Sequence, residues 1–229
     1  AASGELVDTR ATGPLGRAMD TRFGILHGDT AVLEIANVAG LPMVPKEERN
    51  PFNATTRGLG ELVKQALDRG LRKIVIGLGG SATNDGGMGM LSELGVRFRD
   101  ASGELLRGFG RDVGQAASVD FGGLDPRLAE CELIAGCDVK NPLCGPEGAS
   151  RIFGPQKGAA PEQVEVLDRA LKGYAELIER ALERPALRDA PGAGAAGGLG
   201  FALLSLGFAL SPGAQLVDRM VGLESRIAG

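Results

Sequence analysis

The sequence predicts a layered α/β/α fold built on a mixed parallel and antiparallel sheet. Segments with the pattern of buried strands alternate with longer segments whose apolar residues recur at helical spacing. The 229 residues are 43% hydrophobic with one Tyr and no Trp, which is typical of an aliphatic globular core. Glycine-rich loops lie between expected strands and helices, an arrangement found in sheets that bind ligands at one edge.

The first part of the chain predicts three strands, at residues 6–11, 22–26 and 30–36. Turn residues at 13–16 and 27–29 separate them, which favours an antiparallel meander or hairpin. The only histidine, His27, lies in the second turn and is interpreted as a surface residue. Catalytic triads that need a histidine are therefore excluded.

Apolar residues at helical spacing predict a helix at 56–69, after a proline-rich loop at 41–51. The next expected elements are a strand at 73–78, a helix at 87–94, and strands at 96–99 and 132–137. Pro161, a residue favoured at the first helical position, opens a long helix that reaches about Leu182. The most apolar segment, 199–210, predicts a buried helix, because spanning a bilayer takes roughly 20 residues.

The most informative segment is the loop at 79–87, Gly-Gly-Ser-Ala-Thr-Asn-Asp-Gly-Gly, which joins an expected strand to an expected helix. Glycines let backbone N–H groups approach an anion, and the following helix adds its positive N-terminal end. The loop carries more polar side chains than helix capping requires: Ser81, Thr83, Asn84 and Asp85. It is therefore predicted to hold a phosphate or a carboxylate, and a tight turn without a ligand is the alternative.

Two further glycine-containing loops lie at 138–158 and 191–200. Because loops at one edge of an open sheet can converge, we expect the three loops to form one site. Together they supply carboxylates, cations and neutral partners: Asp85, Asp138, Arg151, Lys157, Ser81, Thr83, Asn84, Asn141 and Gln156. This set suits phosphoryl transfer, which uses cations and amides for the phosphoryl oxygens and carboxylates for Mg²⁺. No G-x-x-x-x-G-K-[ST] pattern occurs, so a P-loop kinase is excluded.

Residues 192–197 match the pattern G-x-G-x-x-G, and Asp218 lies about twenty residues further on, as in dinucleotide-binding units. The preceding segment, 186–191, has too few apolar β-forming residues for a buried strand. A nicotinamide-dependent oxidoreductase is therefore the weaker alternative. A close approach between helices, allowed by small residues, is the simpler explanation of these glycines.

Composition and net charge limit the classes of partner that the protein is expected to bind. The net charge is −4 without a basic run, which argues against nucleic acid and anionic membranes and favours a small molecule. Three cysteines without a C-x-x-C pair are interpreted as reduced thiols in the cytoplasm. An oligomer is compatible with the sequence. Because the chain opens with Ala-Ala-Ser and not with Met, we expect it to be a piece of a longer protein.

Several ordered segments resemble the bacterial-type glycerate kinases that lack a P-loop. They are Thr-Thr-Arg-Gly at 55–58, Ile-Gly-Leu-Gly-Gly-Ser-Ala-Thr-Asn-Asp-Gly-Gly-Met-Gly at 76–89, Cys-Asp-Val at 137–139, Asn-Pro-Leu at 141–143, and the runs at 148–158 and 192–198. The resemblance implies two domains, a flavodoxin-like domain made from the two chain ends and an inserted restriction-endonuclease-like domain. Residues 1–229 look like the inserted domain, with the flavodoxin-like domain largely absent.

The resemblance also implies a reaction, the ATP- and Mg²⁺-dependent phosphorylation of D-glycerate to 2- or 3-phosphoglycerate. Binding of the substrate carboxylate or a phosphate is assigned to Gly79, Gly80, Ser81, Thr83, Asn84, Gly86, Asn141 and Gln156. Asp85 is expected to orient or deprotonate the attacking hydroxyl. Arg151 and Lys157 are expected to neutralise phosphoryl charge, and Asp138 to help hold Mg²⁺. A non-catalytic domain that binds glycerate or nucleotide stays open as the alternative.

Overall fold

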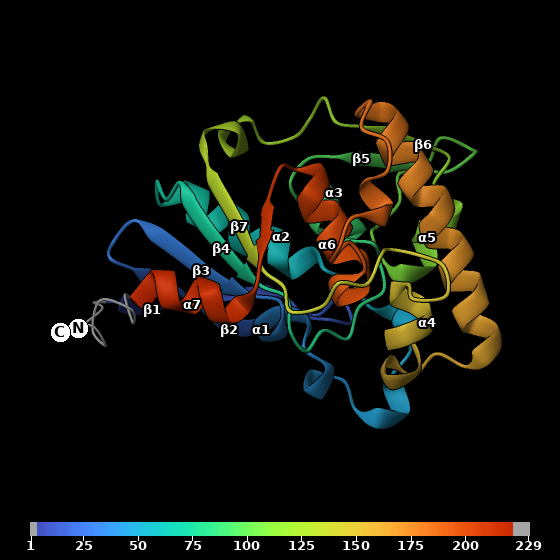
Figure 1. Ribbon diagram of the computed structural model, residues 1–229, viewed down its shortest axis with the longest axis horizontal. Coiled ribbons are helices and arrows are strands. Elements are labelled where there is room, and N and C mark those ends of the chain that lie inside the picture. Colours follow the sequence, from blue (N-terminus) through green and yellow to red (C-terminus); the bar gives the residue numbers. More distant parts are fainter. Residues whose placement is uncertain (1–3, 222–229) are drawn as a thin grey trace.

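The computed structural model describes residues 4–221 (Figure 1). Its centre is a six-stranded sheet in the order β1-β2-β3-β4-β7-β8. The strands are β1 (Gly4–Thr12), β2 (Ala18–Leu26), β3 (Thr30–Glu34), β4 (Lys73–Gly77), β7 (Glu132–Gly136) and β8 (Ala209–Ser211). β1, β2 and β3 pair antiparallel, and β3, β4, β7 and β8 pair parallel. The predicted mixed sheet is therefore confirmed.

Seven α-helices are present in the described part of the chain: α1 (Ala36–Ala39), α2 (Arg57–Asp68), α3 (Met88–Glu93), α4 (Ala149–Phe153), α5 (Pro161–Ala181), α6 (Ala195–Ser205) and α7 (Gly213–Val221). A separate antiparallel ribbon consists of β5 (Arg97–Arg99) and β6 (Ser118–Asp120). The strand expected at 96–99 therefore forms, but outside the main sheet.

Successive side chains of β4 point to opposite faces of the sheet, as the pleat requires. Ile74 and Ile76 are fully buried in the main hydrophobic cluster, whereas Val75 faces the other side with Ile134 and with Leu216 of α7. Figure 1 shows α7 in front of the sheet and α2 behind it. Helices thus cover both faces, which confirms the predicted three-layer arrangement.

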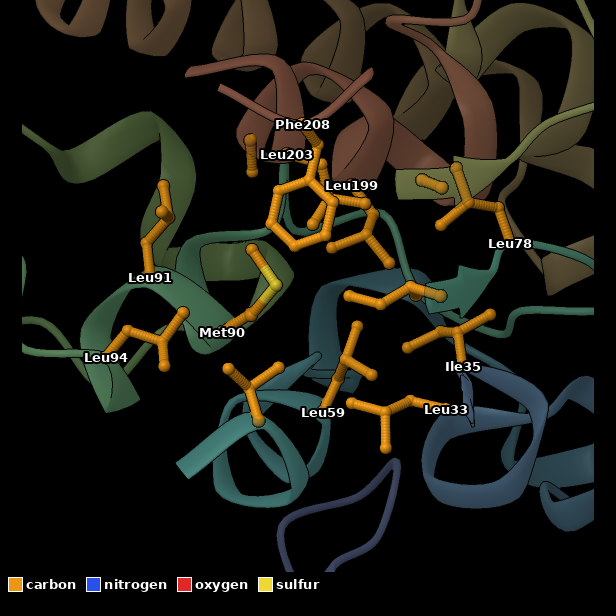
Figure 2. Close-up of a cluster of buried hydrophobic side chains, with 14 of the residues drawn as sticks. Leu33, Ile35, Leu59, Leu78, Met90, Leu91, Leu94, Leu199, Leu203 and Phe208 are labelled. Carbon is orange, nitrogen blue, oxygen red and sulfur yellow. The ribbon is translucent and has the colours of Figure 1, made fainter. Parts of the chain in front are cut away.

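The core on the α2 side joins segments far apart in the sequence. Figure 2 shows side chains of β3, α2, α3 and α6 pointing toward one another, with Leu33, Leu59, Met90, Leu199 and Leu203 among those labelled. None of these five side chains is exposed to solvent. Burial of this apolar surface fixes α3 and α6, the helices that follow two of the glycine loops, against the sheet.

Several element boundaries differ from the sequence prediction. The helix expected at 199–210 ends at Ser205, because Gly207 takes a left-handed φ of 88° and the Phe208 N–H donates to the Leu203 carbonyl. This is a glycine helix stop, and it frees residues 209–211 to form β8. The third strand likewise ends at Glu34 and not at residue 36. The short α1, α4, β6 and α7 were not predicted.

Two other expectations are settled by the fold. A 3₁₀ turn at Leu187–Asp189, and not a strand, precedes the glycines at 192–197, so the dinucleotide-binding interpretation is wrong. No helix within residues 4–221 combines the length and the apolar character needed to cross a bilayer.

Candidate active site

A cavity of about 200 Å³ lies at the carboxyl ends of β4 and β7. These neighbouring parallel strands end at Gly77 and Gly136, so their following loops leave the sheet side by side. Residues 78–81 and 136–139 line the cavity together with Lys157 and the first two residues of α6. The three glycine loops therefore meet at one edge of the sheet, as predicted.

The first turn of α6 contacts the 79–87 loop backbone to backbone. Ala196, Gly197 and Gly198 have left-handed φ angles of 51°, 69° and 93°. The Gly86 N–H donates to the Gly197 carbonyl at 3.0 Å, and a Cβ added to Gly197 would lie 2.0 Å from the Thr83 carbonyl oxygen. Only glycine allows this approach, so the predicted packing role of these glycines is confirmed.

Lys157 is a buried cation in the cavity wall, with only 3% of its surface exposed. Its Nζ donates to Ser81 Oγ at 3.1 Å and to the Thr83 carbonyl at 2.6 Å. Within residues 4–221 no carboxylate lies in ion-pair contact with this ammonium. Burial lowers the pKa of Lys157 to about 7, and the charge of Asp85 opposes that shift. An enclosed ammonium held by neutral acceptors is suited to meeting an anion.

Hydrogen-bond donors of the 79–87 loop complete this environment. The loop is fixed by the Leu41 N–H, which donates to the Gly80 carbonyl, and by the Ala82 N–H, which donates to the Ala39 carbonyl. No hydrogen bond within the described part of the chain uses the backbone N–H groups of Gly79, Gly80 or Ser81. Because the Ser81 oxygen accepts from Lys157, the Ser81 O–H is free to donate. The residues that line the cavity therefore carry an ammonium, a hydroxyl and three backbone N–H groups without a partner in the described part of the chain.

Asp85 belongs to the 79–87 loop but does not line the cavity, and none of its surface is exposed. Its carboxylate accepts hydrogen bonds from the N–H and the hydroxyl of Thr56, at 2.7 and 2.8 Å, and from the N–H groups of Gly87 and Gly89. Burial raises the pKa of Asp85, whereas these hydrogen bonds lower it. This geometry argues against direct contact with a substrate hydroxyl, because the carboxylate is enclosed and already surrounded by donors.

Arg151 does not line the cavity. Its guanidinium donates to both carboxylate oxygens of Glu165, at 2.5 and 2.7 Å, and lies 3.7 Å from Asp168. The arginine therefore joins α4 to α5. The structure does not bring it together with Lys157 as a second cation for the same anion.

The other predicted site residues divide into two groups. Gly79, Gly80, Ser81, Gln156 and Asp138 line the cavity. A second group binds neighbouring loops: Thr83 Oγ1 to the Ala196 carbonyl at 3.3 Å, Asn84 Nδ2 to Ser150 Oγ at 3.0 Å, Asn141 Nδ2 to the Glu147 carbonyl at 2.8 Å, and Gly86 to Gly197. The second group shapes the site without facing its ligand.

Sequence reasoning missed part of the cavity wall. Leu41, Phe153 and Ala196 contribute to it, as do Leu78 and Val139. Leu41 lies in a segment without a chemical motif, and Phe153 is an apolar residue of the run 148–158, so only the fold reveals that they line the cavity. Ala196 is one of four residues other than glycine with a positive φ in the described chain, a strain that sequence does not show.

Asp138 is the acidic residue that lines the cavity. Its Oδ1 accepts from the Gly213 N–H at 2.8 Å, at the start of α7, and the side chain is exposed. No group of three or more His, Cys, Asp or Glu residues suited to a metal ion occurs among the described residues. Mg²⁺ in phosphoryl-transfer sites is usually held by one or two carboxylates and by substrate phosphates. Asp138 fits one such ligand position.

Comparison with known proteins gives consistent matches. The chain is 48% identical to the glycerate 2-kinase of Escherichia coli K12, over 94% of this chain and 57% of the relative, and 47% identical to the glycerate kinase of Bacillus subtilis 168, over 98% and 59%. A crystal structure of a Salmonella typhimurium LT2 protein assigned as glycerate kinase 2 superposes with a TM-score of 0.94 at 46% identity, over 97% of this chain and 60% of that one.

The chain thus spans about three fifths of the length of these relatives. The family model described as "Glycerate kinase family" matches residues 1–229, the whole sequence. With the three loops gathered around a buried lysine and this match over its full length, the chain belongs to the glycerate kinase family.

Proposed function

We propose that this chain forms part of the active site of an ATP-dependent glycerate kinase, which phosphorylates D-glycerate in the presence of Mg²⁺. The observation that carries the proposal is the buried Lys157, which lies in a cavity with the Ser81 hydroxyl and the amides of residues 79–81. Phosphoryl transfer depends mainly on positioning and on electrostatic stabilisation of charged oxygens. Membership of the family supports the same reaction.

In the proposed reaction a hydroxyl oxygen of glycerate attacks the γ-phosphorus of ATP, and the bond between that phosphorus and the β,γ-bridging oxygen breaks. The hydroxyl proton leaves to solvent, and ADP departs. Lys157 and the 79–81 loop hold an oxyanion of the reactants, and Asp138 contributes one ligand to Mg²⁺. When bound, the ion neutralises phosphate charge.

The role of Asp85 changes in this proposal. Its enclosed carboxylate binds the N-terminal ends of α2 and α3 through Thr56, Gly87 and Gly89. Asp85 is therefore a positioning residue that keeps the 79–87 loop in its anion-binding form. Arg151 likewise acts through the packing of α4 on α5 and has no contact with the reactants.

We further propose 2-phosphoglycerate as the product, supported by the glycerate 2-kinase name of the E. coli relative. The three cysteines of the described chain are free thiols, which supports a location in the cytoplasm, where thiols stay reduced. The proposed partners are small molecules, D-glycerate and ATP.

The test is ADP release by the purified chain with Mg-ATP, with D-glycerate or with glycerol as the acceptor. We expect release that depends on D-glycerate, a ³¹P NMR spectrum of the 2-phosphate ester, and loss of most activity in Asp138→Asn. A folded chain that neither releases ADP nor binds D-glycerate would contradict the proposal. Binding of D-glycerate without turnover would favour the alternative of a non-catalytic binding domain.

A further inference from the structure

The size of the cavity and the charge of its wall indicate which oxyanion it holds. The cavity has a volume of about 200 Å³ and is partly open to solvent. Pockets for drug-sized ligands are larger, about 300–1,000 Å³. A three-carbon acid is small enough to lie within this cavity, whereas a whole nucleoside triphosphate would extend beyond it.

The charge of the cavity wall also favours a carboxylate over the triphosphate of ATP. Lys157 is the cation that lines the cavity in the described chain, and Asp138 is exposed at its wall. One buried ammonium balances one carboxylate, whereas the triphosphate of ATP carries several negative charges and needs several cations. The three amides of residues 79–81 and the Ser81 hydroxyl supply the hydrogen bonds that a carboxylate accepts.

The remaining wall suits the rest of a short acid. Leu41, Leu78 and Phe153 are apolar and can contact a carbon chain, whereas Gln156 presents a polar group for a hydroxyl. The cavity wall thus provides contacts for both the carboxylate and the hydroxyl-bearing carbon chain of a small hydroxy acid.

We propose, on the basis of the function proposed above, that Lys157, Ser81 and the amides of residues 79–81 form the carboxylate-binding site for the acceptor, a short hydroxy acid. The nucleotide phosphates then lie outside the part of the cavity around Lys157, on the side of the exposed Asp138. Acceptor specificity is set within this chain by the buried Lys157 and by the cavity volume.

The test measures binding of D-glycerate to the full chain by titration calorimetry, with glycerol and a Mg²⁺-bound non-hydrolysable ATP analogue as the comparison ligands. D-glycerate should bind, and glycerol, which has hydroxyls but no carboxylate, should not. Saturating ATP analogue should leave the D-glycerate Kd unchanged within about twofold, because the two ligands do not share a site. Competition between them would overturn the proposal.

Variants locate the carboxylate. Lys157→Met should weaken D-glycerate binding about ten- to a hundredfold, the usual effect of losing a hydrogen bond to a charged group, and Ser81→Ala about three- to tenfold. Both should leave binding of the ATP analogue unchanged. Lys140→Met, which removes an exposed lysine outside the cavity wall, is the matched control and should bind D-glycerate like the parent chain.

If Lys157→Met does not fold, the conservative Ser81→Ala variant carries the test. Variants that weaken the ATP analogue and spare D-glycerate would overturn the carboxylate site, even if glycerate kinase activity is present. Lys157- and Ser81-dependent D-glycerate binding without ADP release would support the carboxylate site while favouring a non-catalytic binding domain over the proposed kinase function. The two proposals can therefore fail separately.

Discussion

The Lys157 ammonium lies in an enclosed position where its bonded partners, the Ser81 hydroxyl and the Thr83 carbonyl, are neutral. Burial of a charge without a bonded counter-ion is unfavourable, because it disfavours the charged form of the group. The pKa of a buried lysine therefore falls toward neutral pH. Its pKa falls to about 7. The charge of Asp85 opposes this shift. Asp138 and Cys137 line the same cavity, and the Cys137 thiol stays neutral near pH 7 because burial raises its pKa.

Binding of D-glycerate should therefore depend on pH. Lys157 is charged below pH 7 and neutral above it, whereas a carboxylate such as glycerate stays ionised throughout this range. Affinity should be highest below pH 7 and should fall by up to about tenfold per pH unit above it. Calorimetric Kd values from pH 6 to pH 9 measure this slope. Ser81→Ala should raise the Kd at every pH and keep the slope of its pH dependence. A Kd that does not change with pH in the parent chain would contradict the assignment of the carboxylate to Lys157.

Asp85→Asn should reduce stability as well as activity. The amide replaces an oxygen that accepts from Thr56 and Gly89, so buried donors then face a donor. A loss of at least about 2 kcal/mol in the free energy of unfolding is expected, from unsatisfied buried groups. Urea denaturation measures it, and the exposed Asp138→Asn is the control with little effect. An Asp85→Asn chain with parental stability and no turnover would restore the predicted catalytic role.

At this scale the sequence predicted which loops carry the site but not which side chains face the ligand. Ser81, Gln156 and Lys157 line the cavity as expected, whereas Thr83, Asn84 and Arg151 bind other loops and helices. Residue type shows what a side chain can bond. Its direction depends on packing between α4, α5 and α6, which spacing along the chain does not reveal.

At the scale of elements, the contact between α6 and the 79–87 loop rests on the absence of side chains. Gly197→Ala should cost at least about 4 kcal/mol in the free energy of unfolding, because its Cβ would meet the Thr83 carbonyl oxygen at 2.0 Å in addition to a left-handed φ of 69°. Denaturant unfolding and D-glycerate binding should both show the defect.

Gly207→Ala is the matched control for this substitution. Its φ of 88° is also left-handed, but nothing lies within 4 Å of the added Cβ, so only the backbone strain of about 1–2 kcal/mol applies. Equal losses of stability in the two variants would mean that the close approach of the loops contributes nothing.

Arg151 and Glu165 should behave as a clamp between α4 and α5. Arg151→Met and Glu165→Gln should each lower stability by about 1 kcal/mol or less, because both side chains are partly exposed, and should leave D-glycerate affinity unchanged within about twofold. A double-mutant cycle on unfolding free energies measures their coupling. If Arg151→Met alone abolished turnover, the result would support the predicted role of Arg151 as a cation that neutralises phosphoryl charge.

The elements with strong periodicity were the predictable ones. The α2 and α5 helices and the β4 and β7 strands lie where their patterns placed them. The apolar run 199–210 was misassigned beyond Ser205, because hydrophobicity alone cannot separate a buried helix from a buried strand. Gly207 was the available signal for that helix end.

At the scale of the whole molecule, the described chain has one main sheet and one dominant hydrophobic cluster. Tyr174, the sole tyrosine in a chain without tryptophan, is 1% exposed and lies in that cluster between Phe98 and Phe201. Its fluorescence therefore reports on the core without any labelling.

We expect one cooperative unfolding transition, with coincident midpoints by Tyr174 fluorescence and far-UV circular dichroism. D-glycerate at a hundred times its Kd should add about 2.7 kcal/mol to the free energy of unfolding. Separate midpoints would instead mean that residues 1–229 do not behave as the single domain predicted from the sequence.

The order of strands in the main sheet, β1-β2-β3-β4-β7-β8, follows the order in which a ribosome makes them. Each strand that emerges can pair with one already present, so the sheet can grow from one edge during synthesis. The lining of the cavity is synthesised in full much later than β4 and β7, the strands at whose ends it lies. Ala195 and Ala196 are the last of its lining residues to be translated. A nascent chain released before residue 195 would thus carry five of the six strands of the main sheet and Lys157, yet lack the wall that closes the site.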